Sequence, residues 1–110
     1  MTLDQVAGSE TAVFAGSMFR DYHDLLMRDP DNLPRYHVTG NAAAFTANRL
    51  SHFFDLRGPS VSVDTACSTT LAALHLACQS LRAGESSMAV VGGANLILHP
   101  GSSMSLSNLG

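Results

Sequence analysis

The sequence predicts an α/β protein in which helices cover a parallel or mixed sheet, and three observations support this prediction. Strand-like and helical segments alternate along the 110 residues, in the order strand, helix, strand, helix, strand. The strand-like segments are short and rich in apolar or β-branched residues. The last helical segment, from Ser68 to Ala83, is apolar over most of its circumference, which is typical of a helix buried between layers.

The first half of the chain contains one expected strand and one expected helix. Residues 11–16 (TAVFAG) are apolar and end at a glycine, as a short buried strand does. Residues 28–35 are dense in Asp, Asn and Pro, and this composition predicts a loop. A helical segment over residues 42–54 (AAAFTANRLSHFF) follows Gly40-Asn41, because its large apolar side chains recur near helical spacing.

The second half contains two more expected strands around the long helix. Residues Ser60 to Asp64 (SVSVD) alternate and are β-branched, whereas residues Met88 to Leu98 (MAVVGGANLIL) form an apolar run with Gly92-Gly93 allowing close backbone approach. The helix between them carries an apolar stripe of Leu71, Leu74, Cys78 and Leu81. A complete sheet typically has about five strands. Three strands therefore indicate part of a larger layered structure.

The composition limits the classes of function and location. The chain is 45% hydrophobic and only 14% charged, so we expect further chain or a partner to cover part of its surface. A net charge of -3 offers no electrostatic footprint for nucleic acid or an anionic membrane. No apolar run approaches the roughly 20 residues that span a bilayer, and the N-terminus has no signal-peptide pattern. We therefore expect a soluble cytoplasmic protein.

The two cysteines, Cys67 and Cys78, are too few for a disulfide framework or a zinc site. We expect no metal centre. Both fall at or within the long helix, where eleven residues would separate their Cα atoms by roughly 16 Å. That distance excludes a disulfide between them.

Cys67 lies at the junction of a strand and a helix, the geometry that exposes a nucleophile at an elbow. Free N–H groups and the positive end of the helix dipole favour a thiolate there, and the same N–H groups can hold the oxyanion of an attacked thioester. The small neighbours Ala66 and Ser68 leave room for a substrate, and Asp64 can support the elbow by hydrogen-bonding backbone groups. From position alone, a structural cysteine and a nucleophile remain equal alternatives.

No histidine in the sequence is placed to act as a base for Cys67. His75 is eight residues further along the same helix, roughly 12 Å away, and belongs to its narrow polar line. The other four lie in or beside loops without the spacing of metal ligands: His23, His37, His52 and His99.

Several segments, in order along most of the chain, resemble one family. The motif D-T-A-C-S (residues 64–68) has G-P-S upstream (58–60) and ALHLACQSLRAGES downstream. Together with TAVFAGSMFRDYHDLLMRDP, TGN, NRLSHFFDLRGPS and VGGANLILHP, it resembles the β-ketoacyl synthase (ketosynthase) domain of fungal iterative type I polyketide synthases, most closely the highly reducing kind.

The resemblance implies a thiolase-like fold of two similar α/β halves layered as helix, sheet, helix, sheet and helix. Residues 1–110 would be a partial ketosynthase domain from the N-terminal half that carries the nucleophile elbow, with the second half absent. Cys67 would accept an acyl group from a carrier-protein phosphopantetheine thioester and contribute its own N–H to the oxyanion. The acyl-enzyme would then condense with a malonyl thioester and release carbon dioxide. The family's histidine pair and lysine come from later motifs, such as H-G-T-G-T, that do not occur here.

The resemblance also implies partners and a pocket. The partners would be an acyl carrier protein and a second copy of the chain, paired through the strand at Ser60–Asp64, and no cofactor would bind directly. Asn41, Ala42 and Phe45 would help line the acyl pocket, with Ala42 in place of a common glycine and Phe45 in place of a common methionine. The expected elbow supports are Asp64 and Ser68.

Two alternatives remain beside an active ketosynthase. The chain could be a catalytically inactive truncated protein or a dimerisation module that acts through its apolar surface. An α/β-hydrolase with a cysteine elbow would need G-x-C-x-G, and threonines at positions 65 and 69 argue against it.

Overall fold

The computed structural model describes residues 2–110 and contains a parallel sheet of three strands. The strands β1 (Thr11–Gly16), β2 (Ser60–Ser62) and β3 (Met88–Gly93) lie in the order β2-β1-β3. Thr11 to Gly16 pair in parallel register with Met88 to Gly93, and Val13 to Ala15 pair with Ser60 to Ser62. The predicted α/β class and the parallel sheet are confirmed.

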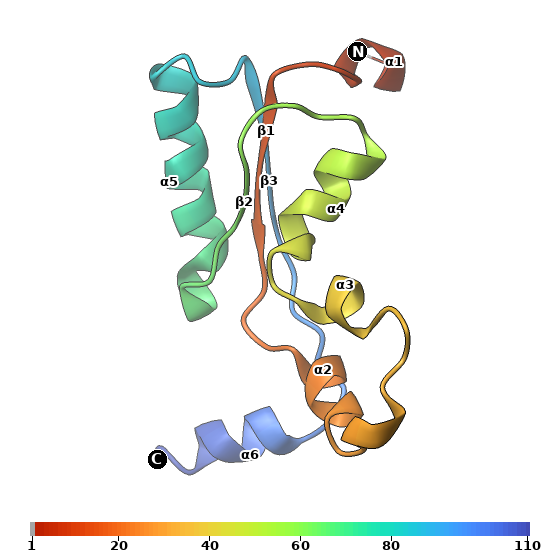
Figure 1. Ribbon diagram of the computed structural model, residues 1–110. Coiled ribbons are helices and arrows are strands. Elements are labelled where there is room, and N and C mark those ends of the chain that lie inside the picture. Colours follow the sequence, from red (N-terminus) through yellow and green to blue (C-terminus); the bar gives the residue numbers. More distant parts are fainter. Residues whose placement is uncertain (1) are drawn as a thin grey trace.

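Two helices cover opposite faces of this sheet, as Figure 1 shows with the sheet seen edge-on: α5 (Thr69–Arg82) on one side and α4 (Phe45–Phe53) on the other. All six residues of β1 are buried, because its side chains alternate between the two layers. Its Ala12 and Phe14 pack against α5. On the other face, Val13 and Ala15 form a cluster with Ala47 and Leu56.

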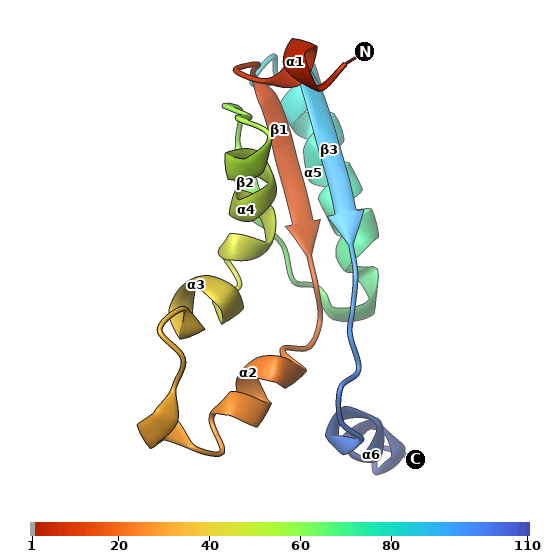
Figure 2. The same cartoon turned by 90° about the vertical axis from the view of Figure 1, so that its right-hand side faces the viewer.

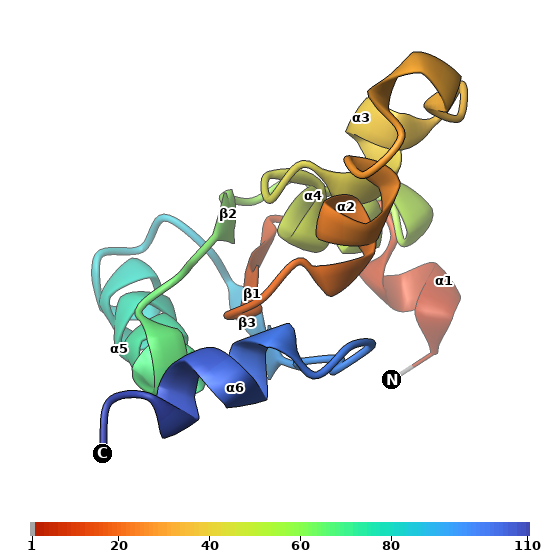
Figure 3. The same cartoon turned by 90° about the horizontal axis from the view of Figure 1, so that it is seen from below.

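Four short helices and two 3-10 turns complete the part of the chain that the structure describes. The helices α2 (Asp21–Leu26), α3 (His37–Asn41) and α6 (Gly101–Ser107) lie beyond the carboxyl ends of the strands (Figure 2), and α1 (Leu3–Val6) lies at the opposite end. Viewed from below, α6 passes beneath those carboxyl ends (Figure 3). The 3-10 turn Pro30–Asn32 falls within the predicted loop. None of the helices of residues 2–110 is both long enough and apolar enough for a membrane crossing.

Several predicted boundaries are wrong. The expected helix over residues 42–54 begins only at Phe45, because α3 already ends at Asn41 and Ala42 has an extended backbone. The third strand ends at Gly93 instead of Leu98, since Gly93 pairs with Gly16, the last residue of β1. Beyond that point, the Ala94 N–H still donates to the Gly16 carbonyl at 3.2 Å, but the register of β1 with β3 has ended. Similarly, β2 ends at Ser62, two residues before the expected end of that strand.

The apolar stripe predicted on α5 is not the face that packs on the sheet. The buried residues of α5 are small ones: Thr69, Ala73, Ala77 and Ser80. Leu71, Leu74 and Leu81 are 73%, 48% and 42% exposed. Small side chains let the helix approach the large Phe14 closely, so the leucines point away from the sheet. Within residues 2–110, α5 is covered by a layer on one side only.

Candidate active site

Cys67 lies in an exposed 3-10 turn, Ala66–Ser68, that connects the strand end after β2 to α5. Ala66 has φ +56°, in the left-handed region that residues with a Cβ rarely adopt. This turns the chain sharply immediately before the cysteine and leaves Cys67 on the surface. The expected elbow between strand and helix is therefore present.

Side-chain hydrogen bonds hold the turn in this shape. Asp64 Oδ1 accepts the Ala66 N–H at 2.9 Å. The Ser68 hydroxyl donates to the Thr65 carbonyl at 2.7 Å and so does not cap α5. The Thr69 hydroxyl spans the turn, because it donates to the Ala66 carbonyl at 2.6 Å and accepts the Thr65 N–H at 3.0 Å.

Thr65 and Thr69 are the elbow residues that the sequence interpretation missed. Thr69 is only 4% exposed, and its hydroxyl bonds two backbone groups of the turn. The signal that could have identified them is the threonine on each side of the cysteine at two residues' distance, since short hydroxyl side chains commonly bond nearby backbone groups in turns.

Glycine allows the strand ends to pack beside this elbow. A Cβ on Gly16 would collide with the Val63 carbonyl and the Thr69 methyl group, and a Cβ on Gly93 would collide with the Thr70 hydroxyl. A Cβ on Gly92 would meet nothing within 4 Å. The expected close approach at Gly92-Gly93 therefore applies to Gly93 alone.

Cys67 borders a cavity of about 220 Å³ at the carboxyl ends of β1 and β3. Its lining includes Ser17, Met18, Thr70 and Asn95. Ligands of parallel α/β sheets bind at these carboxyl ends. A ligand held in this cavity would therefore lie beside Cys67.

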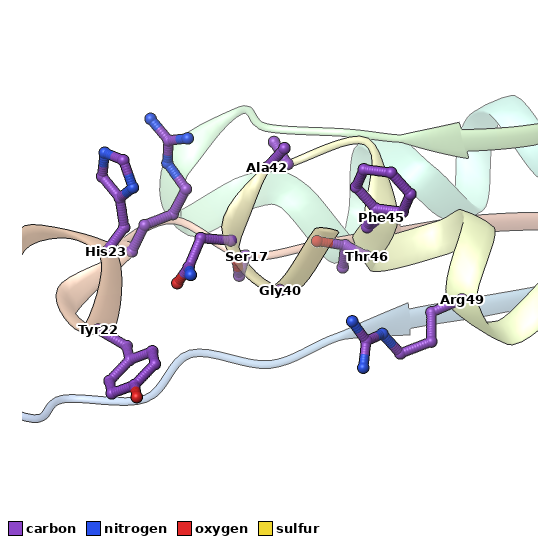
Figure 4. Close-up of a pocket in the computed structure, with 11 residues that line it drawn as sticks. Ser17, Tyr22, His23, Gly40, Ala42, Phe45, Thr46 and Arg49 are labelled. Atoms are coloured by element: carbon purple, nitrogen blue, oxygen red, sulfur yellow. The ribbon is translucent and has the colours of Figure 1, made fainter. Parts of the chain in front are cut away.

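Asn41, Ala42 and Phe45, predicted as pocket residues, lie together in a second cavity of about 240 Å³. Figure 4 shows Tyr22 and His23 of α2 at one end of this cavity and Arg49 of α4 near the other. Cys67 does not line it.

A third cavity of about 190 Å³, which Asp64 helps to line, shares residues with each of the other two. Ser17 lines all three. The predicted pocket and the predicted nucleophile thus occupy neighbouring cavities along one wall of the molecule.

No histidine within residues 2–110 lines the cavity of Cys67. His75 lies against Gln79 on α5, with 3.4 Å between the ring Nε2 and the amide nitrogen. The part of the chain that the structure describes therefore presents an exposed thiol beside the first turn of α5, with no histidine in its cavity.

A second titratable cluster joins α2 to the segment before α6. The Asp21 side chain is 1% exposed and accepts the Leu98 N–H at 2.9 Å and the Ser102 hydroxyl at 3.3 Å. The Leu98 N–H is the main reason that the pKa of Asp21 lies below its ordinary value, against the opposing effect of burial, and the His99 N–H, followed by the His99 ring, adds to the lowering.

This cluster has the composition of a metal site, since single ligand atoms of Asp21, Asp24 and His99 lie within 4.8 Å of one another. However, His99 Nδ1 accepts the Gly101 N–H at 3.0 Å, which places the ring proton on Nε2, the atom that faces Asp21. A protonated Nε2 has no lone pair for a metal. The cluster therefore connects α2 to the residues after β3, through the hydrogen bonds of Asp21 with Leu98 and Ser102.

The fold and the elbow together define the class of protein. A parallel sheet between helices, with an exposed cysteine where a strand turns into the long helix, is the N-terminal arrangement of thiolase-like enzymes. The ketosynthase from module 6 of the bacillaene synthase of Bacillus subtilis 168 superposes with a TM-score of 0.84 at 35% identity, over 99% of this chain and 18% of its own. An oxazolomycin ketosynthase domain from Streptomyces albus gives 0.83 at 36% identity, over 99% of this chain and 19% of its own.

The sequence comparisons identify the family. The β-ketoacyl synthase N-terminal domain matches residues 1–110, and the chain belongs to this family. It is 67% identical over 109 residues to the highly reducing polyketide synthase poxF of Penicillium oxalicum. It is 66% identical over 108 residues to the lovastatin diketide synthase lovF of Aspergillus terreus. These matches cover 99% and 98% of this chain, which spans about 4% of the length of either relative.

Proposed function

We propose that this chain is the nucleophile-bearing part of a ketosynthase in a highly reducing polyketide synthase. The observation that carries the proposal is the exposed Cys67 at the tip of a strained, hydrogen-bonded turn beside an open cavity. A structural cysteine would not need a left-handed alanine before it, and strained backbone of this kind clusters at functional sites. The similarity to polyketide synthases supplies the substrate class.

In the proposed reaction, the Cys67 thiolate attacks the carbonyl carbon of an acyl group carried as a phosphopantetheine thioester by an acyl carrier protein. A carbon–sulfur bond forms, and the oxyanion that develops is held in part by the Cys67 N–H. Collapse of this intermediate expels the phosphopantetheine thiolate and leaves the acyl group on Cys67.

The second step is a decarboxylative Claisen condensation. A malonyl thioester loses carbon dioxide, and the electron pair of the broken bond forms a new carbon–carbon bond to the acyl carbonyl carbon. The Cys67 thiolate then leaves. The histidine pair and the second oxyanion N–H for this step belong to motifs that this sequence does not contain.

The acyl chain on Cys67 would extend along the wall at Ser17 toward Asn41, Ala42 and Phe45. The support is the series of neighbouring cavities that share this wall. The elbow supports would be Asp64 and Ser68, through their bonds to the turn.

A second copy of the chain would pair at the Ser60–Asp64 segment. Within residues 2–110, the strand order β2-β1-β3 leaves β2 at one edge of the sheet, where another strand could pair with it. The same exposed edge, together with the exposed leucines of α5, is also what a non-catalytic dimerisation module would need, and this is the alternative function.

A chimera tests the proposed function against this alternative. The chain replaces the matching segment of the Penicillium oxalicum relative, and the product of condensation between acyl and malonyl thioesters is measured. We expect product from the chimera and none from its Cys67→Ala variant, whereas the 110 residues alone complete no condensation. Equal product from the chimera and the Cys67→Ala variant would refute the role of Cys67, and a discrete dimer of an inactive chimera would favour the alternative.

A further inference from the structure

The segment after β1, residues 17–20, forms the wall that the three cavities share. Ser17 lines all three of them, from the cavity of Cys67 to that of Phe45. Met18 lines the cavity of Cys67 and the one between, and Arg20 lines the latter and the cavity of Phe45. The position of this short segment therefore affects the lining of all three cavities.

Nothing within the segment itself fixes its position. It belongs to neither β1 nor α2, and Arg20, the N-cap of α2, makes no capping hydrogen bond with its side chain. Its middle is held from a distance in sequence, because the Phe19 N–H donates to Asn95 Oδ1 at 3.0 Å across 76 residues. Just beyond its end, Asp21 is held by Leu98 and Ser102.

Unlike Leu98 and Ser102, Asn95 lies at the cavity of Cys67. It follows β3 by two residues and lines the cavity of Cys67, as Ser17 and Met18 do. Its amide oxygen thus ties two sides of one cavity together, namely the end of β3 and the wall at residues 17–20.

We propose that Asn95 is a positioning residue for acyl transfer, which fixes the Phe19 backbone and thereby the width of the passage from Cys67 to the cavity of Phe45. This inference rests on the proposed function. Asn95 acts through the wall, so its loss weakens acceptance of the acyl chain more than it changes the chemistry at Cys67. The loss weakens acceptance of long acyl chains more than that of an acetyl group, because only long chains extend along the wall.

The test uses the chimera with the Penicillium oxalicum relative and compares Asn95→Ala with Asn95→Asp. The aspartate keeps an oxygen to accept the Phe19 N–H, and the alanine does not. Acylation of Cys67 by acetyl and hexanoyl N-acetylcysteamine thioesters is followed by mass spectrometry over a range of concentration and pH. The pH series separates two effects of the aspartate. A charge effect on the thiol displaces the profile of acylation rate against pH, whereas a change in substrate acceptance alters the rates on the plateau of that profile.

For Asn95→Ala we expect the half-saturating hexanoyl thioester concentration to rise about three- to tenfold, with the maximal rate constant within about twofold. The acetyl thioester should change by less than the hexanoyl one. For Asn95→Asp we expect rescue on the plateau, to within about twofold of the unsubstituted chimera. Where Asn95→Ala does not fold, Asn95→Leu, of similar shape and without the acceptor, takes its place.

The inference is overturned if Asn95→Ala has the same half-saturating hexanoyl thioester concentration as the unsubstituted chimera. It is also overturned if Asn95→Asp, on the plateau of the pH profile, is impaired as much as Asn95→Ala. Either result leaves the proposed function standing. A chimera whose Cys67 takes up no acyl group from either thioester overturns both.

Discussion

Strand β1 and the elbow around Cys67 lie at opposite extremes of burial in this chain. All six residues of β1 are buried between α4 and α5, whereas the residues from Asp64 to Ser68 are exposed. The strand is held by packing on two faces. The elbow is held by side-chain hydrogen bonds from Asp64, Ser68 and Thr69. Because local polar contacts rather than packing set the shape of the turn, Cys67 can stay exposed.

Removal of the largest β1 side chain should give the largest loss of stability. Phe14→Ala leaves a cavity between β1 and α5, where Phe14 packs with Ala73 and Ala77. We expect the free energy of unfolding of the chimeric domain to fall by about 3–5 kcal/mol in urea titrations. A loss below about 1 kcal/mol would show that packing around β1 is not what holds the sheet.

Gly16 lies where β1 meets the elbow, and we expect alanine there to destabilise the protein more than alanine at Gly92 does. Gly16→Ala places a Cβ against the Val63 backbone carbonyl, which cannot rotate away, so we expect a loss of about 3 kcal/mol. Gly92→Ala is the matched control, because its Cβ meets nothing within 4 Å. Equal melting temperatures for the two variants would contradict the close approach of β1 to the elbow.

A smaller effect is expected within the elbow itself. Thr69→Val keeps the shape of the side chain but removes the hydroxyl that bonds Thr65 and Ala66. We expect a loss of about 1–2 kcal/mol in stability, together with slower acylation of Cys67. Thr39→Val is the control away from the elbow, where the hydroxyl donates to the Tyr36 carbonyl, and acylation slowed equally in both variants would contradict the role given to Thr69.

The smallest effect concerns Asp21, whose pKa is lowered chiefly by the Leu98 N–H. The folded protein binds this proton less tightly than the unfolded one, so the stabilisation is complete above the ordinary pKa near about 4 and is lost as pH falls through the lowered value. The difference in stability between the unsubstituted domain and Asp21→Asn should therefore be constant above about pH 5 and shrink below about pH 4. Unfolding titrations at several pH values measure it, and a difference that grows toward acid pH would reverse the assignment.

The sequence predicted the parts of the fold that follow from periodicity. The buried strand at residues 11–16 and the long helix after Cys67 lie where they were expected, because apolar patterning is a local property. Patterning did not show which face of α5 meets the sheet. Leucine is the stronger core signal, but the space opposite Phe14 admits only the small Ala73 and Ala77.

At the site, the sequence predicted the elbow at Cys67 and the bond of Asp64 to its backbone, but not the bonds of Thr69. Asn41, Ala42 and Phe45 lie in one cavity, as expected for a shared pocket, and Cys67 lies in its neighbour. Thr69 bonds residues only three and four positions before it, whereas Asn95 bonds a partner that only the folded backbone brings into range. The Phe19–Asn95 bond spans 76 residues and has no local signature.

The most direct test of the central claim compares the two cysteines of one molecule. The chimera is incubated with an acyl N-acetylcysteamine thioester, digested and mapped by peptide mass spectrometry. The account predicts acylation of Cys67, which is exposed at the elbow, and no label on the half-buried Cys78 of α5. The Cys67→Ala variant should then carry no acyl group. Equal labelling of both cysteines, or label on Cys78 alone, would contradict the assignment of Cys67 as the acyl-carrying nucleophile.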